Sequence, residues 1–209
     1  MAAGGFFTDE AKRRVTTAIK EIESQTSAEI IVVVRRVSGR YRHADYLAGS
    51  IAAFTMLLAV LFHPKAVRVE AIPIDVALAF AAGAIFTAYF DPVRRLLAGA
   101  RTMEEHVRTA AGAAFVERGV SRTRGRSGVL VYVGAFERRV EVVRDIGVDP
   151  STAKDAWERA VRALGDSLRE GGDLESFIGA LGALGPALAP DLPRREDDEN
   201  ELPDVPVTE

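Results

Sequence analysis

The sequence predicts an α/β fold that is interrupted by a two-helix transmembrane hairpin, and three observations support this prediction. β-Branched apolar runs of strand length occupy 28–34, 129–133 and 140–143. Stretches with apolar residues at helical spacing lie before and after these runs. Two further segments, 46–62 and 74–90, are almost free of charged residues.

Composition limits the classes of protein to consider. The chain has 209 residues, of which 48% are hydrophobic and 27% charged, as expected for one folded domain with additions or for two small ones. The formal net charge of -3 argues against a nucleic-acid binder, because such a protein needs a basic excess on one face. Since there is no cysteine, disulfides, thiolate metal sites and a cysteine nucleophile are excluded.

The N-terminal part predicts a helix followed by a buried strand. Thr8 is a suitable N-cap, Asp9 and Glu10 favour the positive end of the helix dipole, and apolar residues recur at helical spacing to about Gln25. The run at 28–34 follows, and we expect it to pair with 129–133.

The segments 46–62 and 74–90 predict a helical hairpin that crosses a lipid bilayer. The first holds no charge and the second only Asp75, and each is near the short end of the roughly 17 to 25 residues that a span requires. The alternative is a pair of buried helices, which needs a larger protein around them. Arginines flank the pair at positions 35, 36, 40, 42, 94, 95 and 101, which predicts that both arms of the chain face the cytoplasm.

The remainder predicts helices around two adjacent strands. Residues 92–119 read as one helix or a broken pair, and 129–133 and 140–143 as two strands joined by a turn, with the second strand nearer an edge. A helix is expected from 149 to Gly171-Gly172, and a last helix from about 173 to Gly185-Pro186. The acidic, proline-containing end of the chain is expected to be unpacked.

Arginines at 122, 124 and 126 lie among small polar residues ahead of the first of these two strands. Guanidinium groups match phosphate geometry, so this loop is a candidate for binding a phosphate or an anionic lipid head. The alternative is a solvated loop whose arginines pair with nearby acids.

Several short motifs, taken in order, resemble the membrane-anchored bacterial proteins of the TPM domain family. The resemblance covers nearly the whole chain, the hairpin included. The motifs are FTDE at 7–10, SAEI at 27–30, RYRHAD at 40–45, RTR at 122–124, GVLVYV at 128–133, ERRVEV at 137–142, DIG at 145–147 and DDENELPD at 197–204.

The resemblance implies an α/β/α sandwich around a small mixed sheet, with the hairpin inserted between the first strand and the following helix. It divides the chain into a first part of the TPM-like domain at 1–42, the hairpin at 43–91, the second part at 92–189 and a disordered acidic tail at 190–209. The family includes a thylakoid-lumen protein described as an acid phosphatase, relatives that bind calcium at an acidic edge, and an accessory subunit of a receptor channel. This chain has Ser121 where His is frequent and Arg144 where a small residue is usual, which disfavours hydrolysis and metal binding.

Candidate site residues follow from charge at the expected strand ends. Asp145, Glu29 and Arg138 are candidates for catalysis, and Asp145, Asp149 and Glu29 are candidates for binding a metal, with calcium as the candidate cofactor. Carboxylates at strand ends also occur on an ordinary solvated rim, which is the alternative. The sequence contains no GxxxxGK[ST], GxSxG or HExxH motif.

We therefore expect a binding, assembly or accessory module that is anchored in the lipid bilayer and acts on an unidentified protein partner. The alternative is an acid-phosphatase-like hydrolase of phosphate esters that uses carboxylates and arginines at the sheet edge. We expect no nucleic-acid partner.

Overall fold

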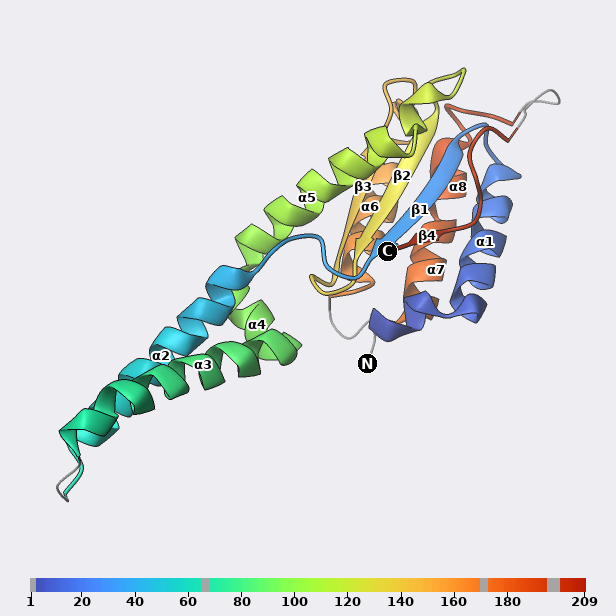
Figure 1. The fold of residues 1–209 in the computed structure, drawn as a ribbon. Coiled ribbons are helices and arrows are strands. Elements are labelled where there is room, and N and C mark those ends of the chain that lie inside the picture. Colours follow the sequence, from blue (N-terminus) through green and yellow to red (C-terminus); the bar gives the residue numbers. More distant parts are fainter. Residues whose placement is uncertain (1–2, 65–67, 170–172, 195–199) are drawn as a thin grey trace. The chain divides into compact units, whose positions relative to one another are not determined.

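The computed structural model describes residues 3–64, 68–169, 173–194 and 200–209, which form two compact units (Figure 1). The globular unit contains the chain up to Ser38 and from Glu104 onward. The hairpin unit is Gly39–Met103, and it includes α4 (Asp91–Ala98), which the sequence boundaries place in the second part of the globular domain.

A four-stranded mixed sheet with the order β3-β2-β1-β4 forms the centre of the globular unit. β1 (Glu29–Arg35) pairs in parallel with β2 (Gly128–Gly134), as the sequence predicts. β3 (Arg139–Arg144) is antiparallel to β2 and lies at one edge, also as predicted. The two-residue β4 (Val207–Thr208) pairs with β1 at the other edge.

Helices cover both faces of the sheet, which confirms the expected α/β/α arrangement (Figure 1). Successive side chains of a strand point to opposite faces. In β1, Ile30 and Val32 therefore belong to one apolar cluster and Ile31 and Val33 to the other. The first face packs against α1 (Asp9–Glu23), α6 (Lys154–Asp166), α7 (Leu174–Gly182) and α8 (Leu184–Leu188), and the second against α5 (Ala100–Glu117).

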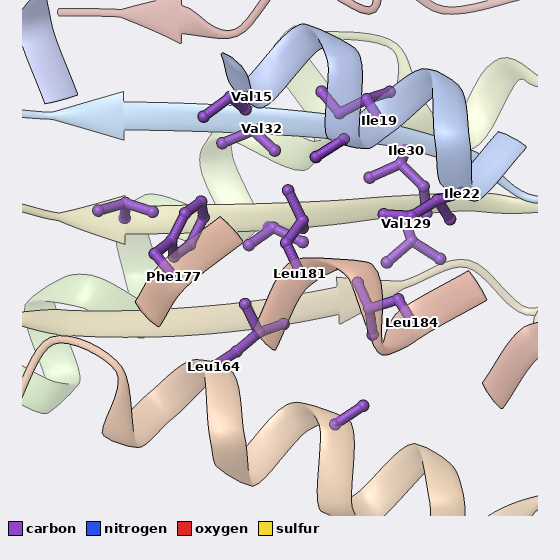
Figure 2. Packing of buried hydrophobic residues seen from close by; sticks show 14 of the residues in the cluster. Val15, Ile19, Ile22, Ile30, Val32, Val129, Leu164, Phe177, Leu181 and Leu184 are labelled. Atoms are coloured by element: carbon purple, nitrogen blue, oxygen red, sulfur yellow. The ribbon is translucent and has the colours of Figure 1, made fainter. Parts of the chain in front are cut away.

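The larger cluster combines residues from both ends of the chain. Figure 2 shows Ile19 of α1, Leu164 of α6 and Leu181 of α7 gathered against the strands. All three are fully buried. The N-terminal helix and the C-terminal helices therefore complete one core on the same face of the sheet.

Local signals in the sequence explain where several helices begin and end. Thr8 caps α1 by accepting a hydrogen bond of 3.1 Å from the Ala11 N–H, and Asp173 caps α7 by accepting one of 2.9 Å from the Ser176 N–H. The region 92–119 is a broken pair of helices rather than one. Gly99 separates them with a φ of 79°, which glycine adopts at little cost.

In the hairpin unit, two long apolar helices pack along each other through small residues. These are α2 (Arg42–Leu61) and α3 (Ile72–Tyr89), and the short helix η2 (Val69–Ala71) precedes α3. A Cβ atom added to Gly83 would lie only 2.8 Å from the Cβ of Ala52, so the two backbones approach closely there. Both helices are long and apolar enough to cross a membrane, and most of their side chains are not buried within the described structure.

The expectation that the last helix stops at Gly185-Pro186 is wrong. The chain remains helical in α8, where Pro186 is the third residue. Proline is tolerated there because the first N–H groups of a helix have no partner within it. The break expected at Gly171-Gly172 lies outside the described residues.

The expectation of a disordered tail is also wrong for 190–194, where the Leu192 carbonyl accepts a hydrogen bond of 3.0 Å from the Ser27 N–H, and for 200–209. Residues 195–199 lie outside the described residues. β4 adds to the edge of β1, and the Leu202 side chain is 9% exposed within the smaller apolar cluster. The Glu209 carboxylate pairs with Arg35 and Arg118. Acidic composition predicts disorder only when the acids lack partners, and here the globular unit supplies them.

Leu164→Ala should destabilise the globular unit by about 3 kcal/mol, because it removes a fully buried side chain and leaves a cavity. The measurement is urea unfolding of the full chain in detergent micelles, followed by the fluorescence of its one tryptophan, Trp157. As a control, Ile146→Ala should change stability by less than about 0.5 kcal/mol, since Ile146 is 79% exposed. Equal losses for the two variants would contradict this account of the core.

Candidate functional site

The predicted site residues fall at two opposite ends of the sheet. Glu29 begins β1, and Asp145 directly follows β3 at the same end, because β3 runs antiparallel to β2. Arg138 lies in the turn between β2 and β3, at the other end. Asp149 is exposed and lines a different cleft with Trp157. The structure therefore does not bring the three catalytic candidates together.

Asp145 is held by an ion pair within the chain. Its side chain is 3% exposed, and Arg126 donates to both carboxylate oxygens at 2.8 and 2.9 Å. The Ile146 N–H donates a further hydrogen bond of 2.7 Å. Burial by itself would raise the pKa of Asp145, but the hydrogen bonds from Arg126 and Ile146 outweigh it and hold the pKa below its usual value. Asp145 is therefore an ionised structural anchor for the loop that carries Arg126.

Glu29 holds the C-terminal segment against the sheet. Its side chain is buried, and its Oε2 atom accepts hydrogen bonds from the N–H groups of Glu201 at 3.1 Å and Leu202 at 3.0 Å. The Glu201 carboxylate in turn accepts a hydrogen bond from the Arg124 N–H at 3.0 Å. This carboxylate oxygen of Glu29 is thus already used to fix the tail.

A polar cleft of about 370 Å³ lies beside Glu29. Glu23 is only 8% exposed there, and its Oε1 atom accepts a hydrogen bond of 3.1 Å from the Ile30 N–H. Burial raises the pKa of Glu23 to about 7; the Ile30 N–H opposes this shift, and the charge of Glu29 adds to it. The cleft is lined by Lys20, Glu23, Ser24, Thr26, Glu29, Arg194, Asn200 and Asp204.

Chemically, this cleft offers one carboxyl group that exchanges a proton near neutral pH, beside the cations Lys20 and Arg194. Within the described ranges, no group of three or more acidic or histidine side chains is arranged to hold a metal ion. The oxygens of Glu29 and Asp145 already accept hydrogen bonds from N–H groups of the chain. Among the described residues, the carboxylates of Glu29 and Asp145 therefore hold segments of the chain itself.

A second polar cluster lies at the opposite end of the sheet. Glu137 is 4% exposed and accepts hydrogen bonds from the Ser38 N–H at 2.7 Å and the Ser38 hydroxyl at 3.0 Å. The Tyr132 hydroxyl, at the end of β2, donates to Ser38 Oγ at 3.1 Å. These contacts fix Ser38, the last residue of the globular unit before the chain enters the hairpin unit.

Reasoning from sequence missed Glu23, and it did not predict that Glu137 holds Ser38. Glu23 lies four residues after Ile19, on the apolar side of its helix, so a charged residue at that spacing was a usable signal. Glu137 carries no such signal, because it lies in a turn and its partner Ser38 is 99 residues away in the chain.

Comparison with known proteins supports the fold. The NMR structure of the BA42 protein from the psychrophilic bacterium Bizionia argentinensis is similar, with a TM-score of 0.58 and 18% sequence identity. The similarity covers 98% of this chain and 96% of that one. No family model matches the chain, and no curated protein does. At this identity the likeness establishes the architecture alone.

The raised pKa of Glu23 predicts a pH dependence of stability. A carboxyl group that is harder to ionise in the folded state stabilises the fold fully below its usual pKa of 4.5, and this contribution is lost as the pH rises to about 7. We expect Glu23→Gln to remove a decline of about 2 to 3 kcal/mol between pH 4.5 and 8. Urea unfolding followed by Trp157 fluorescence measures the decline in both proteins, and parallel curves would refute the assignment. Asp145 does not contribute to this decline, since its pKa is lowered and it ionises below that range.

Proposed function

We propose that the protein is a membrane-anchored module of the TPM domain type that binds or assembles a protein partner near the bilayer. The observation that carries this proposal is that the acidic candidate site residues Asp145 and Glu29 already have hydrogen-bond partners within the chain. Asp145 pairs with Arg126, and Glu29 holds the backbone of Glu201 and Leu202. Catalytic groups must reach substrate, whereas these carboxylates stabilise loops. The ordered motifs from FTDE at 7–10 to DIG at 145–147 support the family.

The pairing of β1 with β2 limits how the chain crosses a membrane. These strands come from before and after the hairpin unit, yet they pair residue by residue in one sheet. Both arms of the chain must therefore lie on the same side, and the segment between them crosses the bilayer an even number of times. Two apolar helices, α2 and α3, satisfy this requirement.

The arginines that flank the two helices favour the cytoplasmic side for both arms. We therefore propose an inner-membrane protein of a bacterium, with two spans and with both termini in the cytoplasm.

Single-cysteine labelling tests this topology, because the chain contains no cysteine of its own. Arg159→Cys lies on the exposed side of α6, and Val69→Cys lies in the connection between α2 and α3, where Val69 is 72% exposed. A membrane-impermeant maleimide should label Val69→Cys in intact spheroplasts and Arg159→Cys only in inverted vesicles. Labelling of both variants from one side would refute a hairpin that crosses the bilayer.

A phosphatase is the second candidate, and the cleft around Glu23 is the observation that favours it. Glu23 exchanges its proton near neutral pH, and Lys20 and Arg194 line the same cleft. Phosphoryl transfer needs both an acid or base and positive charge. The hydroxyl groups of Ser24 and Thr26 in this cleft donate to the backbone carbonyls of Glu21 and Leu192, so binding remains our first proposal.

We expect the purified full chain to give no turnover of p-nitrophenyl phosphate between pH 5 and 8, with or without calcium or magnesium. Turnover above the rate of a mock preparation would reverse the ranking of the two functions if Glu23→Gln abolishes it while the Trp157 unfolding midpoint is retained. Asp145→Ala would then show whether Asp145 contributes to the reaction.

A further inference from the structure

Two arginines have the same unusual backbone conformation. Arg126 and Arg138 both have a φ of 52°, in the left-handed region that side chains other than glycine rarely adopt. Among the described residues, no other residue except glycine has a positive φ. Such a conformation persists where the surrounding structure holds the residue in it.

The contacts of Arg126 explain its conformation within the fold. Its guanidinium group makes two hydrogen bonds to the buried carboxylate of Asp145. Paired charges in this geometry are among the stronger polar interactions in proteins. The ion pair offsets the strain at Arg126.

Arg138 has the same strain without such a contact. Its Nε atom is buried and has no hydrogen-bond partner, and no ion pair to its guanidinium occurs within the described ranges. A buried guanidinium N–H without an acceptor is costly, since it has lost its water. The four-residue turn between β2 and β3, which ends at Arg138, accounts for this φ, so the unmet N–H is what points to an anionic group from outside the chain.

Arg36 lies beside the same turn and adds positive charge. Its backbone carbonyl accepts a hydrogen bond of 2.9 Å from the Phe136 N–H, and its guanidinium lies 5.4 Å from the centre of the Phe7 ring. Two acids at this end of the sheet already have partners, since Glu137 holds Ser38 and Glu209 pairs with Arg35. This end of the sheet therefore carries unneutralised arginine.

We propose that Arg138, with Arg36, binds the phosphate group of an anionic phospholipid at the carboxyl end of β1 and β2. The inference rests on the proposed membrane anchoring and names the lipid as a partner of the module. The chain leaves this end of the sheet at Ser38 and continues directly into the unit with the apolar helices. Arginines next to a membrane span are attracted to anionic headgroups, which favours a lipid over a soluble phosphate. By contrast, Arg126 in the loop at 122–126 is paired with Asp145.

The test compares Arg138→Gly with Arg126→Gly in the full chain, purified in neutral detergent. Both variants lose the same charge at the same φ, and glycine relieves the strain in each. Calorimetry measures the affinity for short-chain phosphatidylglycerol, with short-chain phosphatidylcholine and inorganic phosphate as separate ligands. Urea unfolding followed by Trp157 fluorescence measures stability.

We expect Arg138→Gly to weaken phosphatidylglycerol binding about tenfold while the unfolding midpoint is unchanged or higher. Arg126→Gly should lower the midpoint, because Asp145 loses its partner, and should keep the lipid affinity within twofold. Phosphatidylcholine and inorganic phosphate should bind at least tenfold more weakly than phosphatidylglycerol.

Three results would overturn the proposal. Equal loss of affinity in the two variants would mean that net charge alone attracts the lipid. An equal loss of stability would make Arg138 a structural residue like Arg126. If inorganic phosphate binds as tightly as phosphatidylglycerol, the ligand is not specifically a lipid. If cysteine labelling disproves the hairpin but Arg138→Gly still selectively weakens phosphatidylglycerol binding, the proposed anchoring fails and the anion site stands.

Discussion

The parallel pairing of β1 with β2 is the constraint on which the rest of the structure depends. Parallel neighbours cannot be joined by a tight turn, so a long crossover must lie between them. In this chain the crossover contains the whole hairpin unit and then α5. Because both strands are buried on both faces, helices from the two arms must meet over one sheet. An insertion that crosses a bilayer is compatible with this sheet only if it returns to the side from which it left.

Buried carboxylates have a common role at the two ends of the sheet. Glu23, Glu29 and Glu137 each accept a hydrogen bond from a backbone N–H outside their own helix, strand or turn, and Asp145 accepts one from its neighbour Ile146. Backbone N–H groups at strand ends and in loops need such acceptors when water is excluded. The acids are thereby committed to holding the fold together. The charged groups that remain available to a ligand are the arginines Arg36 and Arg138.

The C-terminal segment is ordered by tertiary contacts, although its composition predicts an unpacked tail. Residues 200–209 are acidic and contain proline, a pattern typical of an unpacked tail. The open edge of β1 nevertheless needs a cover, and a strand edge pairs readily with any extended segment that reaches it. Glu29 fixes the backbone at Glu201, and the Glu209 side chain meets Arg35. These partners belong to the first part of the chain, so local composition contained no sign of them.

The sequence by itself determined most of the elements of this protein, because these depend on neighbours within a few residues. The Thr8 cap, the continuous apolar run at 129–133 and the uncharged runs at 46–62 and 74–90 are all local patterns. The sequence also predicted that 28–34 pairs with 129–133, since both segments are apolar at nearly every position. Only the tertiary structure decided which charged groups meet. Arg126 with Asp145, Glu29 with the tail and Glu137 with Ser38 join segments 19 to 173 residues apart. The spacing of these residues in the sequence does not predict that they meet. They come together because the apolar faces of the helices and strands pack against each other.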